Sequence, residues 1–146
     1  ESPKSLETGP LLQAKKSLHI LLAEDDRSNA LPIQQLLQKA GHNVALAENG
    51  QQVLDLLNDQ EFDVILMDVQ MPVMDGVETT REIRRLEESQ HSSISASQHS
   101  RIPIIALTAY AMQGDREKFL EAGMNDYLAK PVDMKDLEKA LSRIAK

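Results

Sequence analysis

The chain has 146 residues, enough for one domain with its own core and fewer than two domains usually need. With 41% hydrophobic and 27% charged residues, its composition is that of ordinary soluble globular domains, and a net charge of −7 argues against a general nucleic-acid binder. The absence of cysteine excludes disulfides, thiolate chemistry and cysteine-based zinc sites, and it fits a reducing compartment.

Neither a membrane span nor a signal peptide is visible in the sequence. The longest mostly apolar run, residues 102–112, contains Pro103 and is too short to span a bilayer. Residues 1–17 carry two prolines, a glycine and scattered charge without a sustained period, which predicts a linker or tail. Because the chain starts at Glu1 and not at a methionine, we expect a piece of a larger protein, with one domain over residues 18–146.

Strand and helix patterns alternate along this domain. The first strand is followed by a helix that ends before Gly41, with Pro32 expected in its first turn, where a missing N–H costs little. Apolar runs predict strands at residues 18–23, 43–47, 63–68, 102–108 and 126–130. The later helices are expected at residues 50–60, 76–88, 114–123 and 133–146, the last of them capped by Asp133.

The fold class follows from this order, which is β–α repeated five times. The main strands are continuous apolar runs, which indicates burial on both faces and therefore a parallel sheet. Right-handed crossovers then give an α/β fold, an open, doubly wound five-stranded sheet with helices on both sides. Ligands of such sheets lie beyond the carboxyl ends of the strands.

One polar segment interrupts the pattern. Residues 89–100 read SQHSSISASQHS, and we expect an extended polar loop over residues 89–101, at the edge of the sheet opposite the ligand crevice. A metal site at His91 and His99 is one interpretation, and a simple polar loop is the other.

Polar side chains converge where four of the strands end. The first strand ends in Glu24-Asp25-Asp26, the third in Asp68, the fourth in Thr108 and the fifth in Lys130. Crowded carboxylates repel one another and raise each other's pKa, and a hard cation such as Mg²⁺ relieves that repulsion. The Lys130 ammonium compensates further. An ionised Asp68 would then be a nucleophile that needs no base, suited to accepting a phosphoryl group.

Several polar and aromatic residues also have a plain structural interpretation. Asp25 could be a helix N-cap, a role that Asp26 or Ser28 could equally take. Tyr127 could be a half-buried core aromatic. The basic residues of the third helix, Arg81, Arg84 and Arg85, are most simply a solvated helix face.

Four motifs give a resemblance to a known family. "LLAEDDRSN", "DVILMDVQMPVMDG", "IPIIALTAYAM" and "AGMNDYLAKPVD" together resemble the response-regulator receiver domain of two-component signalling, over Ser17 to Lys146. The resemblance implies a flavodoxin-like fold with strand order 2-1-3-4-5. Two features depart from the family pattern, Pro32 and the long polar loop.

The resemblance also implies a role for each site residue. Asp68 would be the phosphoacceptor, and Lys130, joined to Pro131 by a cis bond, would contact the phosphoryl group. Thr108 and Tyr127 would be the switch pair that reorients on phosphorylation. The implied Mg²⁺ ligands are Asp25 and Asp68 directly, Glu24 through water, and the Gln70 backbone carbonyl.

The predicted function is therefore a phosphoacceptor domain of a phosphorelay, loaded by a phosphohistidine donor domain of a histidine kinase or a phosphotransfer protein. It would phosphorylate and dephosphorylate itself only slowly, and it would contact neither nucleic acid nor membrane. We expect it to be cytoplasmic and part of a hybrid sensor histidine kinase, either soluble or anchored in a membrane; a stand-alone response regulator is the alternative. A haloacid-dehalogenase-type phosphatase is disfavoured because Gln70 stands where that family has a second Asp as acid–base. A phosphorylation-independent binding module is disfavoured because the whole polar set is present.

Overall fold

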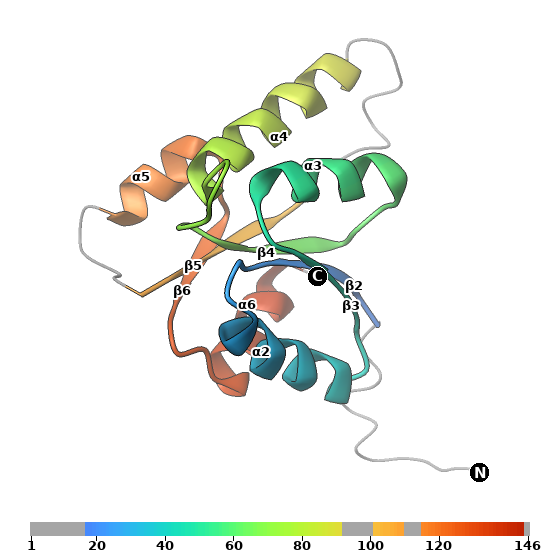
Figure 1. The fold of residues 1–146 in the computed structure, drawn as a ribbon, viewed down its shortest axis with the longest axis vertical. Coiled ribbons are helices and arrows are strands. Elements are labelled where there is room, and N and C mark those ends of the chain that lie inside the picture. Colours follow the sequence, from blue (N-terminus) through green and yellow to red (C-terminus); the bar gives the residue numbers. More distant parts are fainter. Residues whose placement is uncertain (1–16, 92–100, 110–114, 145–146) are drawn as a thin grey trace.

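A five-stranded parallel sheet lies at the centre of the molecule (Figure 1). The computed structural model describes residues 17–91, 101–109 and 115–144. Its strands are β2 (His19–Ala23), β3 (Asn43–Ala47), β4 (Val64–Asp68), β5 (Ile104–Thr108) and β6 (Asp126–Ala129), in the order β3-β2-β4-β5-β6. Counted along the chain, this is the predicted order 2-1-3-4-5, so the predicted fold is confirmed.

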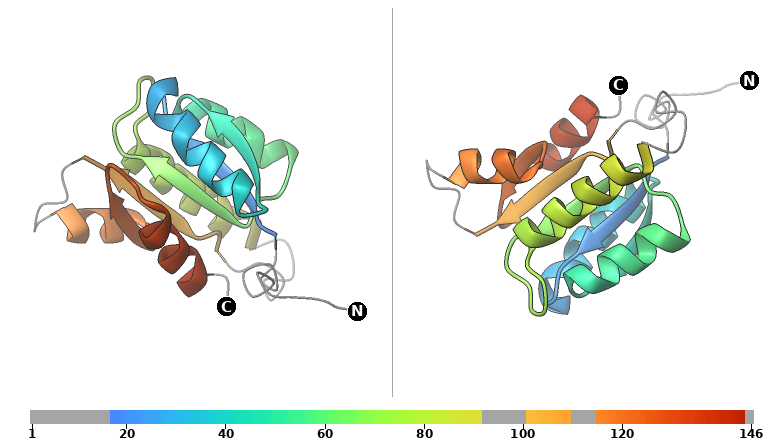
Figure 2. Two further views of the ribbon diagram at one scale, coloured as in Figure 1. Left: turned by 90° about the horizontal axis from the view of Figure 1, so that it is seen from below. Right: turned by 90° about the horizontal axis from the view of Figure 1, so that it is seen from above.

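Helices cover both faces of the sheet. They are α2 (Arg27–Lys39), α3 (Gly50–Asp59), α4 (Gly76–His91), α5 (Asp115–Ala122) and α6 (Met134–Ile144). Figures 1 and 2 show α3, α4 and α5 over one face and α2 and α6 over the other. None of the helices in the described ranges is long and apolar enough to cross a membrane.

Two apolar cores result, one on each side of the sheet. Alternate residues of β2 point to opposite faces: Ile20 and Leu22 pack with α2 and α6, whereas Leu21 and Ala23 pack with α3, α4 and α5. All five residues of β4 and of β5 are buried, as their continuous apolar runs predicted. The edge strands β3 and β6 are only partly buried.

The helix that contains Pro32 begins earlier than expected. The Asp26 carboxylate accepts a hydrogen bond from the Ser28 N–H and caps α2, which starts at Arg27. Pro32 therefore lies in the second turn and not in the first, so the prediction was wrong. Its ring is on the exposed side of the helix. The Asp133 cap of α6 is confirmed, because its carboxylate accepts from the Asp136 N–H.

The polar segment after α4 is shorter than predicted. Helix α4 continues to His91, so residues 89–91 belong to the helix and not to the loop. A change to polar residues does not by itself end a helix. The rest of the loop, residues 92–100, lies outside the described residues, as do residues 1–16 of the expected linker.

Candidate phosphoryl-acceptor site

The carboxyl ends of four strands, β2, β4, β5 and β6, bring the predicted polar residues together. Glu24 and Asp25 directly follow β2, Asp68 ends β4, Thr108 ends β5 and Lys130 directly follows β6. These residues surround one hollow, which is also lined by Asp26, Asn29, Val69, Gln70, Met71, Pro72, Asp75, Ala109 and Pro131. Sequence positions up to 106 residues apart thus form a single site.

Lys130 bridges the two buried carboxylates of this hollow. Its Nζ lies 2.8 Å from Glu24 Oε1 and 3.2 Å from Asp68 Oδ2. The side chains of Glu24 and Asp68 are only 1% and 5% exposed. One ammonium therefore faces two carboxylates in a water-poor place, and the site keeps an excess of negative charge.

The pKa values of this group reflect that imbalance. Burial raises the pKa of Glu24, and the neighbouring Asp68 raises it further, against the lowering effect of Lys130. Burial lowers the pKa of Lys130, but its hydrogen bond to Glu24 and the charge of Asp68 outweigh that, and the pKa lies above its ordinary value. Lys130 is thus held as a cation, and Glu24 is a buried carboxylate that a second positive charge would stabilise in its ionised form.

A third carboxylate completes a set that fits a metal ion. Oxygens of Glu24, Asp25 and Asp68 lie within 4.8 Å of one another, and Asp25 is exposed whereas the other two are buried. Three carboxylate oxygens around an open hollow are the donor set of a hard divalent cation such as Mg²⁺, with room left for water ligands. Asp26, not Asp25, is the helix cap, so the Asp25 carboxylate remains available to this set.

Backbone groups hold Asp68 and Lys130 in place. The Gln70 N–H donates to Asp68 Oδ1 at 3.1 Å, and the Lys130 N–H donates to the Thr108 carbonyl at 2.8 Å. The Lys130–Pro131 bond is cis, as the resemblance implied. Gln70 lines the hollow, and its carbonyl as a metal ligand stays a prediction.

The predicted switch residues lie on neighbouring strands. Thr108 is 4% exposed and lines the hollow. In the register of β5 and β6 it is paired with Ala129, two residues beyond Tyr127. The Tyr127 ring is half-buried, with its centroid 6.4 Å from that of Phe119 on α5. This is the packing of a core aromatic, and reorientation of the pair stays a prediction.

Glycine 76 is a requirement of the site that the sequence analysis missed. A Cβ at this position would lie 2.3 Å from the Asp68 carbonyl oxygen and 2.9 Å from the Val69 Cα. Next to it, Asp75 caps α4: its carboxylate accepts from the Glu78 N–H, and Glu78 accepts in return from the Asp75 N–H. The Asp-Gly pair ahead of a helix was the available signal, since it combines a cap with a residue that allows close backbone contact.

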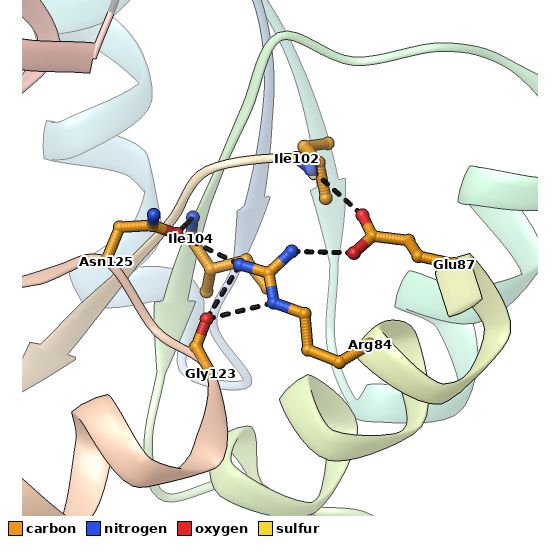
Figure 3. Close-up of polar contacts among 6 residues, drawn as sticks. All are labelled: Arg84, Glu87, Ile102, Ile104, Gly123 and Asn125. Atoms are coloured by element: carbon orange, nitrogen blue, oxygen red, sulfur yellow. Dashed lines mark hydrogen bonds and ion pairs between the residues drawn. The ribbon is translucent and has the colours of Figure 1, made fainter. Parts of the chain in front are cut away.

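The prediction for Arg84 was wrong. Instead of lying on a solvated face, Arg84 is 7% exposed and forms the centre of a polar cluster at the amino end of the sheet (Figure 3). Its Nε and Nη2 donate to the Gly123 carbonyl at 2.9 and 2.7 Å, Nη2 also donates to Asn125 Oδ1, and Nη1 pairs with Glu87 at 2.9 Å. Burial lowers the pKa of Arg84 and the Glu87 carboxylate opposes this, so the guanidinium stays charged.

The same cluster reaches the start of β5. The Ile102 N–H donates to Glu87 Oε2 and the Ile104 N–H donates to Asn125 Oδ1, both at 2.9 Å. Arg84 and its partners thus fix α4 against the residues that precede β5 and β6 (Figure 3). The burial of Arg84 was not predicted from helical spacing, since all three arginines were assigned to one solvated face. Of the three, only Arg81 and Arg85 are exposed.

Comparison with known proteins identifies the kind of domain. The family model "Response regulator receiver domain" matches residues 20–142. Hybrid signal transduction histidine kinase I of Dictyostelium discoideum is 41% identical over 128 residues, which is 84% of this chain and 7% of the relative. The chain spans only 7–18% of the length of curated relatives of this kind.

Two solved structures are similar over almost the whole domain. The receiver domain of sensor histidine kinase PA1611 from Pseudomonas aeruginosa, with magnesium coordinated in its active site cleft, is 43% identical with a TM-score of 0.73, covering 89% of this chain and 98% of that chain. The second is the co-crystal structure of the Saccharomyces cerevisiae histidine phosphotransfer protein Ypd1 with the receiver domain of Ssk1. It is 32% identical with a TM-score of 0.80, covering 88% of this chain and 89% of that chain.

Proposed function

This chain belongs to the response regulator receiver domain family, and on that premise we propose that it accepts a phosphoryl group on Asp68 from a phosphohistidine donor. The observation that carries the proposal is the buried Asp68 carboxylate, ion-paired with Lys130 and within 4.8 Å of the Glu24 and Asp25 carboxylates. A structural ion pair needs no second and third carboxylate. A site that receives a phosphoryl group needs this acidic set to hold a cation.

In the proposed reaction, an Asp68 carboxylate oxygen attacks the phosphorus atom of the donor. The P–N bond to the donor imidazole breaks, its electron pair stays on the imidazole nitrogen, and an acyl phosphate forms on Asp68. The Lys130 ammonium, 3.2 Å from Asp68, is placed to neutralise charge on the transferred oxygens, and the Thr108 side chain lies at the same hollow. Mg²⁺ held by Asp25 and Asp68, with Glu24 through water and the Gln70 carbonyl, would neutralise the remaining negative charge.

The proposed partner is a histidine-bearing phosphotransfer domain, of a kinase or of a separate protein. The similarity to a receiver that was crystallised with a histidine phosphotransfer protein supports this. In the domain itself we propose only slow self-phosphorylation and self-dephosphorylation, without contact to nucleic acid or membrane. The family match favours a signalling receiver over a haloacid-dehalogenase-type phosphatase.

Phosphorylation is proposed to act through the switch pair. New hydrogen-bond acceptors at Asp68 would draw the Thr108 hydroxyl towards the phosphoryl group, and Tyr127 would follow. The Tyr127 ring contacts Phe119 of α5, so a shift would change the surface of α5, β6 and α6. Such coupling is typically worth about 1–3 kcal/mol, or about 5–150-fold in partner affinity.

We further propose that the domain is part of a hybrid sensor histidine kinase on the cytoplasmic side of a membrane, with a stand-alone regulator as the alternative. Support comes from the similarity to a hybrid kinase, of which the matched region is only 7%. The length and order of domains in the full gene product would decide between the two.

Labelling with acetyl phosphate tests the proposed acceptor. The wild type should gain a hydroxylamine-sensitive label in the presence of Mg²⁺ but not when the metal is chelated beforehand, and Asp68→Asn should gain none. Asp55→Asn, an exposed change on α3, is the matched control and should label normally. Undiminished labelling of Asp68→Asn would refute the assignment. Rapid multiple turnover of an aryl phosphate would instead support the phosphatase.

A further inference from the structure

Beside the proposed acceptor site, the loop between β4 and α4 contains an unusual residue. Val73 has φ of +71°, and in the described part of the chain it is the one residue other than glycine with a positive φ. For a β-branched side chain this backbone conformation is a genuine outlier. The Met74 N–H donates to the Pro72 carbonyl at 2.7 Å and closes a three-residue turn around Val73, a turn type that is rare and strained.

Surrounding contacts impose this turn. The Gly50 N–H at the start of α3 donates to the Met74 carbonyl at 3.2 Å, and a Cβ on Gly50 would lie 2.7 Å from that oxygen. The Thr79 hydroxyl donates to the Asp75 carbonyl at 2.7 Å, and Asp75 caps α4. Strained conformations persist where the surroundings over-determine them in this way. Glycine or asparagine would adopt the same turn at a lower cost.

Burial does not explain a valine at this position. Val73 is 79% exposed, more than any other large hydrophobic residue in the described ranges, where the next is Leu31 at 45%. It follows Met71 and Pro72, which line the hollow above Asp68. An apolar ridge, Met71-Pro72-Val73, thus stands at the rim of the site. Met71 also packs against the core, whereas Val73 costs backbone strain and does not belong to the core.

The position of the ridge indicates what covers it. Asp68 is 4% exposed at the bottom of the hollow, so a donor imidazole must enter the hollow to reach it. The surface of the donor domain around that imidazole must then lie on the rim. Small phosphodonors such as acetyl phosphate reach Asp68 without covering the rim at all.

We propose that Val73 is a recognition contact for the phosphohistidine donor domain, packing against an apolar patch beside the donor histidine. The inference rests on the proposed function of Asp68 as acceptor. Val73 acts in docking only, so it should affect transfer from a protein donor and leave transfer from a small donor unchanged. Its strained turn holds the side chain out in one orientation, which lowers the entropy lost on binding.

Comparing two donors tests this. The receiver is loaded either with acetyl phosphate or with Ypd1 of Saccharomyces cerevisiae that has been phosphorylated with phosphoramidate, using the wild type, Val73→Gly and Val73→Asn. Both substitutions suit a positive φ, so neither should lower the urea midpoint of unfolding. Leu86→Asn, which removes a 39% exposed leucine about 15 Å along α4 from Gly76, is the matched control.

The expected result is a loss specific to the protein donor. The rate of transfer from phosphorylated Ypd1 to both Val73 variants should fall about three- to tenfold, the loss expected when one apolar residue is removed from an interface. The rate of loading by acetyl phosphate should stay within about twofold of the wild-type rate. The Leu86→Asn control should match the wild type with both donors.

Other outcomes would overturn the inference. Unchanged transfer from Ypd1 to the Val73 variants removes the docking role, and so does a wild type that loads from acetyl phosphate but not from phosphorylated Ypd1. A change in the oligomeric state of the Val73 variants would assign the ridge to a second copy of this chain instead. Failure of Asp68 to load from either donor would overturn the proposed function itself, which separates the two failures.

Discussion

The two ends of the sheet each bury a charged cluster, and the two clusters differ in how their charges balance. At the carboxyl end, the single ammonium of Lys130 faces the buried carboxylates of Glu24 and Asp68, with Asp25 close by. At the amino end, the Arg84 guanidinium faces one carboxylate, Glu87, and its other N–H groups are bound by the Gly123 carbonyl and by Asn125.

This difference separates a site from a structural clamp. In the Arg84 cluster a carboxylate opposes the guanidinium charge and four of the five N–H donors are bound within the protein, so the cluster serves to fix α4, β5 and β6. The Lys130 cluster keeps an excess of negative charge, which a cation and an incoming phosphoryl group can use. We therefore expect stability to depend on the Arg84 cluster and chemistry to depend on the Lys130 cluster.

The largest expected effect is on stability, from Arg84→Met. Removing the guanidinium leaves the Glu87 carboxylate, the Gly123 carbonyl and the Asn125 amide without their main donor, and should lower the free energy of unfolding by about 3–5 kcal/mol. Urea denaturation would measure this. Arg85→Met is the adjacent control: its ion pair with Glu82 is on the surface, so no measurable change is expected. Equal effects at both positions would mean that Arg84 is not a clamp.

Next in size is the effect of Lys130→Met on chemistry. Without the ammonium, the transferred oxygens lose the positive charge 3.2 Å from Asp68, and loading by acetyl phosphate at saturating Mg²⁺ should slow about 100-fold. Phosphorylation would be followed at a temperature where circular dichroism shows the variant to be folded. The exposed Lys135→Met on α6 should load like the wild type, and a Lys130 variant that loads equally fast would refute the role of the ammonium.

Gly123→Ala should disturb the clamp directly. Gly123 has φ of +112°, and a Cβ there would lie 2.7 Å from the Arg84 Cγ, so we expect a loss of about 2 kcal/mol in the free energy of unfolding. Gly41 has a similar φ of +97° but open space around the added atom, so Gly41→Ala should cost only about 1 kcal/mol. Thermal or urea unfolding of both variants isolates the contact with Arg84, and equal losses would show that the contact is unimportant.

The smallest effect should come from a titratable group at the amino end. His42 Nδ1 accepts a hydrogen bond from the Leu18 N–H at 3.0 Å, which requires the neutral ring, and burial lowers the pKa of His42 despite Glu138 of α6 nearby. The unfolded chain therefore binds a proton more readily, so stability should be full above about pH 6.5 and decrease modestly as the pH falls below it. Urea unfolding at pH 7.5 and 5.5 measures the decrease. In His42→Gln the decrease should be smaller, and an unchanged pH dependence would exclude this histidine.

The sequence was most informative where a residue's role depends on its position along a strand. Continuous apolar runs predicted buried parallel strands, and the acids, threonine and lysine that end these runs predicted one shared site. A parallel sheet places all its carboxyl ends on one edge, so the side chains at these positions meet without any knowledge of packing. The α4 boundary and the turn of α2 that contains Pro32 were missed, because helix ends depend on caps such as Asp26 that compete with neighbouring candidates.

Residue patterns were enough to predict the buried strands, the core on both faces of the sheet and the acidic set with Lys130, and the resemblance supplied the strand order. They did not predict that Arg84 is buried while Arg85 is exposed, that Gly76 and Gly123 leave room for a neighbour, or that Val73 is held in a strained turn. Periodicity is a property of one segment, whereas burial of a single charge or strain at a single residue is imposed by the other segments packed against it.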